Sequence, residues 1–263
     1  MTLRLVAFHA FPLDGRMWGA VKAAAASGQL GEGVVVSAPD FRGRGASGLP
    51  AERTHPMSLL ATDAMGLLRG EEPFVLMGLS MGGYVALELL ARLGPGLRPR
   101  LRGVVLCDSR ANADDEAGKK KRADTAAAVE ANGMEPLLDA MLPQFLAPAS
   151  RGRALEQLVK TMFLATPPAT AAADQRGMAE RHDRFDVLGT LTVPFLAVVG
   201  EDDPLTPPSA SEAMVEAAGN APYVELLTLP GAHMAPLENP ELFLPKLAAF
   251  LDRGVEHVGD RPA

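Results

Sequence analysis

FVLMGLSMGGYVALELL, the sequence of residues 74–90, begins as a continuous apolar run and ends with the apolar spacing of a helix. A continuous apolar run is typical of a strand buried on both faces, so the pattern predicts a strand that turns directly into a helix. Gly78, Ser80 and Gly82 fall on that turn, where glycine is favoured because strand and helix crowd the backbone. Ser80 should then project above the sheet at the positive end of the helix, the position of a serine nucleophile.

The chain of 263 residues is 48% hydrophobic and 22% charged, which is typical of a globular protein. It contains no apolar run of membrane-spanning length and no secretion signal over residues 1–8, so we expect a cytoplasmic protein without a membrane partner. The formal net charge of −7 argues against nucleic acid as a partner. Cys107 is the single cysteine, which excludes an intrachain disulfide, and the five histidines lack metal-ligand spacing, so no metal is expected.

Strand patterns alternate with helical patterns along most of the chain. Strands are predicted at residues 3–8, 34–39, 103–108, 193–199 and 223–229, in addition to the run that begins at residue 74. Helices are predicted up to about residue 27, at 58–68, from the turn to about residue 94, at 209–218 and at 241–251, before a polar tail over 252–263. This alternation predicts an α/β fold of about six parallel strands flanked by helices, with the active site at the carboxyl ends of the strands.

Residues 109–187 break this alternation, because alanine, methionine and charged residues recur there at helical spacing. Breaks at Asn132-Gly133, Pro143, Pro148 and residues 166–168 divide the segment into four short predicted helices. An all-helical insert between parallel strands has to lie above a sheet edge, so we expect a helical cap over a core formed by residues 1–108 and 188–263. A basic run inside the cap, residues 119–122, is interpreted as a solvated helix face rather than an anion site.

Three residues with complementary chemistry follow three different strands: Ser80, Asp203 and His233. A serine hydroxyl is a weak nucleophile near neutral pH and needs a neighbouring base, which His233 can supply. The imidazole in turn needs a carboxylate that fixes its tautomer and stabilises the imidazolium. We assign that role to Asp203.

The tetrahedral intermediate of acyl transfer carries an oxyanion, and each donor aimed at it contributes about 3 kcal/mol. One donor should be the N–H of Met81, directly after the nucleophile. The other should be the N–H of Phe11 in the loop after the first strand, where Pro12 has no N–H to offer. Phe11 and Met81 are also expected in the pocket wall, and His9 is interpreted as a structural residue that holds the loop.

Five short motifs follow one another in a fixed order: His-Ala-Phe-Pro (residues 9–12), Asp-Phe-Arg-Gly-Arg-Gly-Ala-Ser (40–47), Gly-Leu-Ser-Met-Gly (78–82), Gly-Glu-Asp-Asp (200–203) and Gly-Ala-His (231–233). With these motifs the chain resembles the α/β-hydrolase superfamily of serine esterases and lactonases over nearly its whole length. Within it, the chain is most similar to the small capped hydrolases grouped with 3-oxoadipate enol-lactonases. The resemblance implies an α/β-hydrolase fold and a small-molecule ester or lactone substrate, without a cofactor.

Two departures from the superfamily pattern are visible. Ala10 replaces the usual glycine of the first loop, which should be tolerated where the backbone angles allow a side chain, and the two amino-terminal strands usual in the superfamily are expected to be absent. Two other aspartates are alternatives for the carboxylate that orients His233. Asp202 adjoins Asp203, and Asp108 stands at a strand end where some relatives carry the catalytic acid. The spacing of three residues after Gly200 favours Asp203.

These residues predict a serine hydrolase that cleaves a carboxylic ester or lactone through an acyl-enzyme. Enol-lactone, thioester and carbon–carbon hydrolysis and perhydrolysis are alternatives on the same triad, and a non-enzymatic, receptor-like ligand-binding module is the alternative of a different class. The loop with Asp40, Arg42 and Arg44 is interpreted as a structural turn held by ion pairs rather than a substrate site. The exposed edge strand left by the missing amino-terminal strands favours a homodimer.

Overall fold

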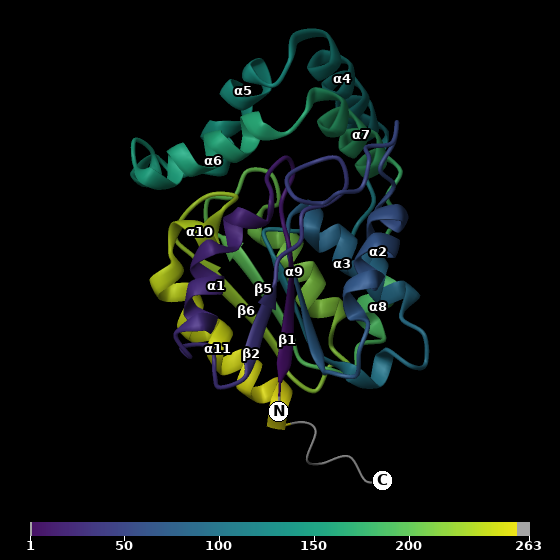
Figure 1. Ribbon diagram of the computed structural model, residues 1–263, viewed down its shortest axis with the longest axis vertical. Helices are drawn as coiled ribbons and strands as arrows, with labels where there is room; N and C mark the ends of the chain where they lie inside the picture. Colours follow the sequence, from purple (N-terminus) through teal and green to yellow (C-terminus); the bar gives the residue numbers. More distant parts are fainter. Residues whose placement is uncertain (1, 257–263) are drawn as a thin grey trace.

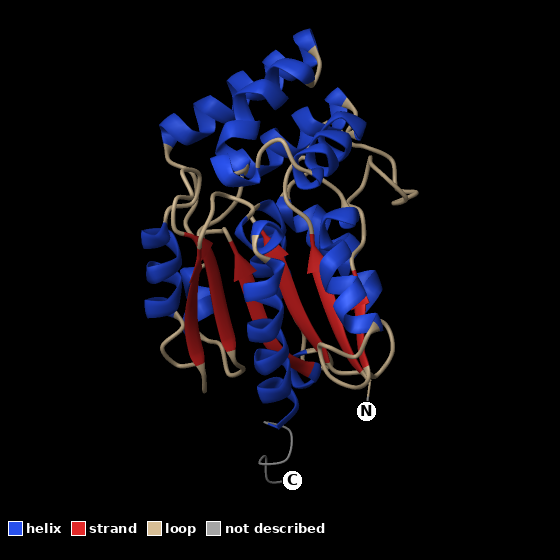
Figure 2. Ribbon diagram, turned by 90° about the vertical axis from the view of Figure 1, so that its left-hand side faces the viewer, coloured by secondary structure: helices blue, strands red, loops and turns tan. Residues whose placement is uncertain are grey.

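A single six-stranded parallel sheet runs through the part of the chain that the computed structural model describes, residues 2–256 (Figures 1 and 2). Its strands are β1 (Leu3–Phe8), β2 (Val34–Ser37), β3 (Phe74–Leu79), β4 (Leu101–Cys107), β5 (Phe195–Gly200) and β6 (Val224–Leu229). Their order across the sheet is β2-β1-β3-β4-β5-β6, and every neighbouring pair is parallel. The predicted fold of about six parallel strands is confirmed.

Burial along the strands explains the order of the sheet. Every residue of β3 and β5 is buried, as continuous apolar runs predict, whereas β2 and most of β6 are only partly buried at the two edges. The strands with the apolar runs therefore lie inside the sheet. Their carboxyl ends meet at the same edge, where the loops after β1, β3, β5 and β6 come together.

Helices cover both faces of the sheet. One face carries α1 (Gly19–Ala26) and α11 (Pro240–Glu256), which contact each other, and the other carries α2 (Met57–Met65), α3 (Met81–Arg92), α8 (Phe185–Gly189) and α9 (Pro208–Ala217) (Figure 1). Shorter turns of helix are η1 (Gly15–Trp18), η2 (Gly66–Leu68), η3 (Arg98–Arg100), η4 (Pro148–Ser150) and α10 (Ala235–Glu238). No described helix combines the length and the apolar character needed to cross a membrane.

Four further helices, which we call the upper helices, lie beyond the carboxyl ends of the strands (Figures 1 and 2). They are α4 (Glu116–Asn132), α5 (Glu135–Phe145), α6 (Ala154–Ala165) and α7 (Pro168–Ala179). Four helices are found, as predicted, but α4 is longer than expected with 17 residues, and Pro143 lies inside α5 instead of marking a break. Asp115 caps its first turn by accepting from the Gly118 N–H, and Gly133 ends it with a φ of 80°. The division of the chain into a core and a cap domain stays a prediction.

The last helix differs from its prediction. It was expected to end at residue 251 before a polar tail, but α11 continues to Glu256, and residues 257–263 lie outside the described residues. Polar composition alone does not end a helix, and Arg253 gains a contact in the added turn because its guanidinium lies 4.4 Å from the centre of the Tyr223 ring. The tail prediction was therefore wrong over residues 252–256.

The loop after β2 is a structural turn, as predicted. Asp40 accepts hydrogen bonds from the N–H groups of Gly15 and Ala46, each at 2.7 Å. Arg42 forms a two-point ion pair with Asp63 of α2, at 2.7 and 2.8 Å. These contacts fix the loop against the core on both sides.

A buried ionic cluster joins this loop to the upper helices. Asp174 of α7 pairs through one carboxylate oxygen with Arg44 and through the other with the Nδ1 atom of His55, the latter at 2.7 Å. All three side chains are at most 1% exposed. Because both partners of Asp174 belong to the segment between β2 and α2, the cluster fixes α7 over the sheet.

Candidate active site

Ser80 stands on the turn between β3 and α3 in a backbone conformation that few residues other than glycine adopt. Its φ is 53° and its ψ is −115°, a conformation that costs about 1–3 kcal/mol. Neighbours hold it in place, because its N–H donates to the Cys107 carbonyl at 2.9 Å and its carbonyl accepts from the Ser109 hydroxyl at 3.0 Å. The turn is thus anchored to the end of β4.

The two glycines that flank Ser80 are required by packing. A Cβ atom on Gly78 would collide with the backbone of Gly82 and Gly83, and one on Gly82 would collide with the Phe8 carbonyl of β1. The backbone therefore leaves no room for a side chain at either position. This is the crowding that the sequence predicts for a tight strand-to-helix turn.

Asp203 and His233 meet at the carboxyl end of the sheet, one after β5 and the other after β6. The Nδ1 atom of His233 lies 2.8 Å from Oδ2 of Asp203, and the two residues are 2% and 3% exposed. Because the carboxylate occupies Nδ1, the other ring nitrogen is left for a partner in the cavity described below. The ring of Phe145, from α5, packs against the imidazole with 5.8 Å between ring centres.

The surroundings of Asp203 favour its charged form. Burial alone would raise its pKa, but the pair with His233 and the hydrogen bonds from Thr206 outweigh burial and hold the pKa below its ordinary value. The Thr206 hydroxyl donates to Oδ2 at 2.6 Å, and the N–H groups of Leu205 and Thr206 donate to Oδ1 at 2.8 and 3.0 Å. Thr206 was not predicted from the sequence, although a threonine three residues after an aspartate is a recognisable side-chain turn.

The two alternative acids lie elsewhere. Asp108 is fully buried, but it accepts from the N–H groups of Gly200 at 2.8 Å and Ala235 at 3.2 Å rather than from His233. Burial, reinforced by the charge of Asp203, raises the pKa of Asp108 well above its usual value. Asp202 is exposed, and its backbone N–H donates to the Gly231 carbonyl at 3.0 Å. Of the three aspartates, the structure brings only Asp203 to His233.

The loop after β1 is held by His9. Its Nδ1 lies 2.9 Å from the Ala10 carbonyl, and its Nε2 accepts the Phe41 N–H at 3.0 Å, which defines a neutral ring with the proton on Nδ1. Burial and the nearby charge of Arg44 lower the pKa of His9 to about 4. His9 is therefore a structural residue, as predicted.

Ala10 and Phe11 occupy ordinary backbone positions in this loop. Among the described residues other than glycine, only Ser80 and Asp108 have a positive φ, so Ala10 takes an angle that tolerates a side chain. This agrees with the expected tolerance of alanine. The peptide bond between Phe11 and Pro12 is cis. Within the described part of the chain, the N–H groups of Phe11 and Met81 donate to no other residue.

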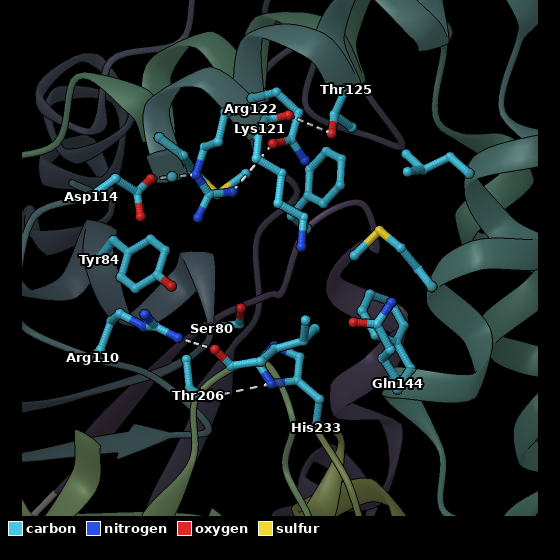
Figure 3. A pocket seen from close by; sticks show the side chains of 18 of the residues that line it. Ser80, Tyr84, Arg110, Asp114, Lys121, Arg122, Thr125, Gln144, Thr206 and His233 are labelled. Atoms are coloured by element: carbon cyan, nitrogen blue, oxygen red, sulfur yellow. Dashed lines mark hydrogen bonds and ion pairs between the residues drawn. The ribbon is translucent and has the colours of Figure 1, made fainter. Parts of the chain in front are cut away.

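A cavity of about 370 Å³ lies between these loops and the upper helices, and Ser80 and His233 both line it (Figure 3). The residues that line it are Phe11, Ser80, Tyr84, Arg110, Asp114, Gly118, Lys121, Arg122, Thr125, Leu137, Ala140, Met141, Gln144, Phe145, Gln175, Met178, Leu205, Thr206 and His233. Among the described hydrogen bonds, none joins the Ser80 hydroxyl to His233. Phe11 and Met81 were both expected in the pocket wall. The prediction is confirmed for Phe11 and wrong for Met81, the first residue of α3, whose side chain is fully buried in the hydrophobic core.

The basic run at residues 119–122 is divided between solvent and cavity. Lys119 and Lys120 form exposed ion pairs on α4, as a solvated face requires, but Lys121 and Arg122 line the cavity. Lys121 is nonetheless exposed, as a solvated face requires, whereas Arg122 is partly buried and pairs with Asp114, so the prediction was wrong for Arg122. Successive helical residues point about 100° apart, so a run of four cannot stay on one face. Two further lining residues were not predicted from the sequence: Arg110, in the loop after β4, and Tyr84, on the first turn of α3.

Comparisons with known proteins agree with this arrangement. A family model described as the alpha/beta hydrolase family matches residues 5–246. The 3-oxoadipate enol-lactonase 1 of Acinetobacter baylyi is 26% identical over 215 residues, which cover 81% of this chain and 76% of that protein.

Solved structures extend the likeness to nearly the whole chain. A thermophilic esterase from Thermogutta terrifontis, solved with malate bound, is 32% identical with a TM-score of 0.86, and the match covers 97% of this chain and 91% of the esterase. The enol-lactonase from Burkholderia xenovorans LB400 is 22% identical with a TM-score of 0.81 over 96% of this chain and 92% of its own, a likeness of fold. Sequence motifs, parallel sheet and family match agree: the chain belongs to the alpha/beta hydrolase family, as a hydrolase of the esterase and lactonase type.

Proposed function

We propose that the protein hydrolyses carboxylic esters or lactones through an acyl-enzyme on Ser80. The observation that carries the proposal is the Asp203–His233 pair, 2.8 Å apart, on the same cavity as Ser80. An esterase and enol-lactonases among the similar proteins support the same class of bond. Because one fold can support many chemistries, these side chains, rather than the fold, indicate the reaction.

In the first half of the reaction, Ser80 becomes acylated. Oγ attacks the carbonyl carbon while His233 Nε2 takes the hydroxyl proton, and a tetrahedral intermediate forms. When that intermediate collapses, the bond to the alkoxy oxygen breaks, and His233 returns the proton to the leaving alcohol. In a lactone the alcohol stays attached to the acyl chain. The step requires Oγ to come within hydrogen-bond distance of His233 Nε2, a contact that in many enzymes tightens only when the substrate is bound.

In the second half, water repeats the same steps. His233 takes a proton from the water as its oxygen attacks the acyl carbon, and then returns that proton to Ser80 Oγ as the ester bond breaks. The carboxylic acid leaves. Asp203 stays ionised throughout and stabilises the imidazolium, a role that fits its lowered pKa. Each step uses only groups of this chain and water.

The oxyanion of both intermediates has two candidate donors, the N–H groups of Phe11 and Met81. Neither N–H has a hydrogen-bond partner among the described residues, and Met81 opens α3, whose helix dipole favours negative charge at this end. Phe11 also lines the cavity on the side of the first loop. Each donor should contribute about 3 kcal/mol of transition-state stabilisation.

The proposal is tested with a panel of substrates. The panel contains 4-nitrophenyl esters of short carboxylic acids and a set of simple lactones. We expect turnover by the wild type, loss of that turnover in Ser80→Ala, and unchanged activity in Ser209→Ala, a control on the exposed start of α9. A fluorophosphonate probe should add its mass to the peptide that contains Ser80. If the wild type is no faster than Ser80→Ala on every substrate, or if the probe labels another residue, the proposed function is wrong.

A further inference from the structure

The ionisable side chains on the cavity wall are mostly basic. Apart from His233 and Tyr84, the lining includes three cations, Arg110, Lys121 and Arg122, and one carboxylate, Asp114. Lys121 and Arg122 come from α4, and Figure 3 shows them above Ser80 and His233. A substrate held at Ser80 therefore faces a positively charged wall.

The single carboxylate of the wall is already neutralised. Asp114 forms ion pairs with Arg122 at 2.6 Å and with Arg181 at 2.6 Å. Burial would raise its pKa, but these two arginines outweigh burial and lower it, so Asp114 stays charged and paired. Arg122 also donates to the Gln175 side chain at 3.2 Å. The charges of Asp114 and Arg122 thus compensate each other. No carboxylate of the wall is left to pair with Arg110 or Lys121.

Lys121 differs from the other lysines of its run. Lys119 pairs with Glu116 and Lys120 pairs with Asp124, each at 2.7 Å, whereas Lys121 has no ion-pair partner among the described residues. Its side chain extends from α4 into the cavity, with its ammonium group directed toward the space above Ser80 (Figure 3). An ammonium group that points into a substrate cavity and lacks a carboxylate partner is suited to bind an anionic group of the ligand.

Arg110 adds a second positive charge to the cavity. One of its terminal nitrogens donates to the Leu205 carbonyl, which holds the guanidinium beside the loop that carries Asp203 and Thr206. It forms no ion pair with a described carboxylate. Lys121 therefore offers an unpaired ammonium for direct contact, and Arg110 contributes to the positive potential around it.

The cavity wall also contains apolar side chains. Leu137, Met141, Phe145 and Met178 line it, and the cavity volume of about 370 Å³ suits a small ligand. We propose, on the basis of the proposed esterase function, that the cavity selects esters or lactones that carry a carboxylate separated by a short carbon chain from the bond to be cleaved, and that Lys121 binds this carboxylate.

A carboxylate fits this wall better than a phosphate. Phosphate groups are commonly held by the two-point geometry of a guanidinium, but Arg122 is paired with Asp114, and one terminal nitrogen of Arg110 donates to the Leu205 carbonyl. Among the described cations of the wall, the Lys121 ammonium alone has neither an ion pair nor a hydrogen bond, and its single charge matches one carboxylate. Lys121 is a specificity residue in this proposal and takes no part in the proton transfers.

The test compares substrates that differ by one charge. In the acyl arm, 4-nitrophenyl hydrogen glutarate is compared with its neutral methyl ester, and in the alcohol arm, 4-acetoxybenzoate is compared with methyl 4-acetoxybenzoate. The wild type should prefer the charged member of at least one pair in kcat/KM. Lys121→Met should reduce that preference about tenfold, the effect of losing a charged hydrogen bond that solvent partly screens, while kcat/KM for the neutral member stays within about twofold.

Matched variants separate this result from general damage. Lys120→Met removes the neighbouring lysine, which pairs with Asp124 outside the cavity, and should leave both preferences unchanged. Lys121→Glu should reverse the preference by repelling the charged substrate. If neutral esters are turned over but Lys121→Met leaves the charge preference unchanged in both arms, the carboxylate subsite is wrong and the esterase function stands. If no ester is hydrolysed faster than by Ser80→Ala, the proposed function itself fails.

Discussion

His9 predicts a dependence of folding stability on pH that can be worked out from its surroundings. The imidazole is fully buried and uses both nitrogens, one beside the Ala10 carbonyl and one accepting from the Phe41 N–H. A second proton would remove the acceptor for Phe41 and place a charge in the core. For this reason burial, assisted by the charge of Arg44, lowers the pKa from 6.5 to about 4.

The sign follows from comparing the folded and unfolded chains. Between pH 6.5 and about 4 the unfolded chain binds a proton at His9 that the folded protein does not bind, so the free energy of unfolding decreases as the pH falls through this window. Above pH 6.5 this contribution is complete. Each pH unit within the window corresponds to about 1.4 kcal/mol, so roughly 2 kcal/mol should be lost between pH 7 and pH 4.5.

The assay is urea unfolding at several pH values between 7 and 4.5, followed by the fluorescence of the buried Trp18. His9→Gln is less stable at pH 7 because it loses buried hydrogen bonds, but its stability should fall by roughly 2 kcal/mol less than that of the wild type over this range. His182→Gln, which removes an exposed histidine, should follow the wild type. If the free energy of unfolding decreased equally in the wild type and in His9→Gln, His9 would titrate alike in the folded and unfolded states. That result would refute the reasoning.

Four further outcomes are expected. Asp203→Asn should lower kcat for esters by about 10⁴ because His233 loses the carboxylate that orients it, as measured by steady-state kinetics; a decrease below tenfold would contradict the assigned acid. Thr206→Val should lower kcat about tenfold with little change in KM, because Asp203 loses a hydrogen bond on the oxygen that contacts His233. Asp174→Asn should destabilise the fold by about 3–5 kcal/mol in thermal denaturation, whereas Glu130→Gln, at a more exposed ion pair, should cost less than about 1 kcal/mol. The unpaired outer edge of β2 leads us to propose a homodimer, which a monomeric mass by light scattering would exclude.

The fold could be predicted from sequence because its signals are local. A buried strand is visible as an apolar run, and Gly78 and Gly82 mark the turn because packing at that point admits no side chain. The same holds for the ends of β5 and β6, where Asp203 and His233 follow their strands directly. Each residue could be assigned to a strand end without knowing any long-range contact, and parallel pairing then brings the strand ends to one edge.

The cavity wall could not be predicted in the same way. Whether the exposed Lys121 also reaches the cavity depends on how α4 lies over the sheet. Helix α4 packs against α7, which the buried Asp174–Arg44 pair fixes to a distant segment. Met81 illustrates the same limit at a single residue. It begins α3 directly after Ser80, as the predicted strand-to-helix turn requires, but its side chain is buried in the core. Local patterns fix backbone positions better than side-chain directions.

The reacting groups and the proposed specificity group thus stand on different parts of the molecule. Asp108 ties the loops after β5 and β6 together through the N–H groups of Gly200 and Ala235, so the Asp203–His233 pair is held by the sheet itself. Lys121 stands on α4 and contributes nothing to that network. A change at Lys121 can therefore alter which ester is bound without disturbing the proton transfers, whereas a change at Asp108 would disturb them for every ester. This separation is why the charge preference and the neutral-ester activity should respond independently to the Lys121 variants.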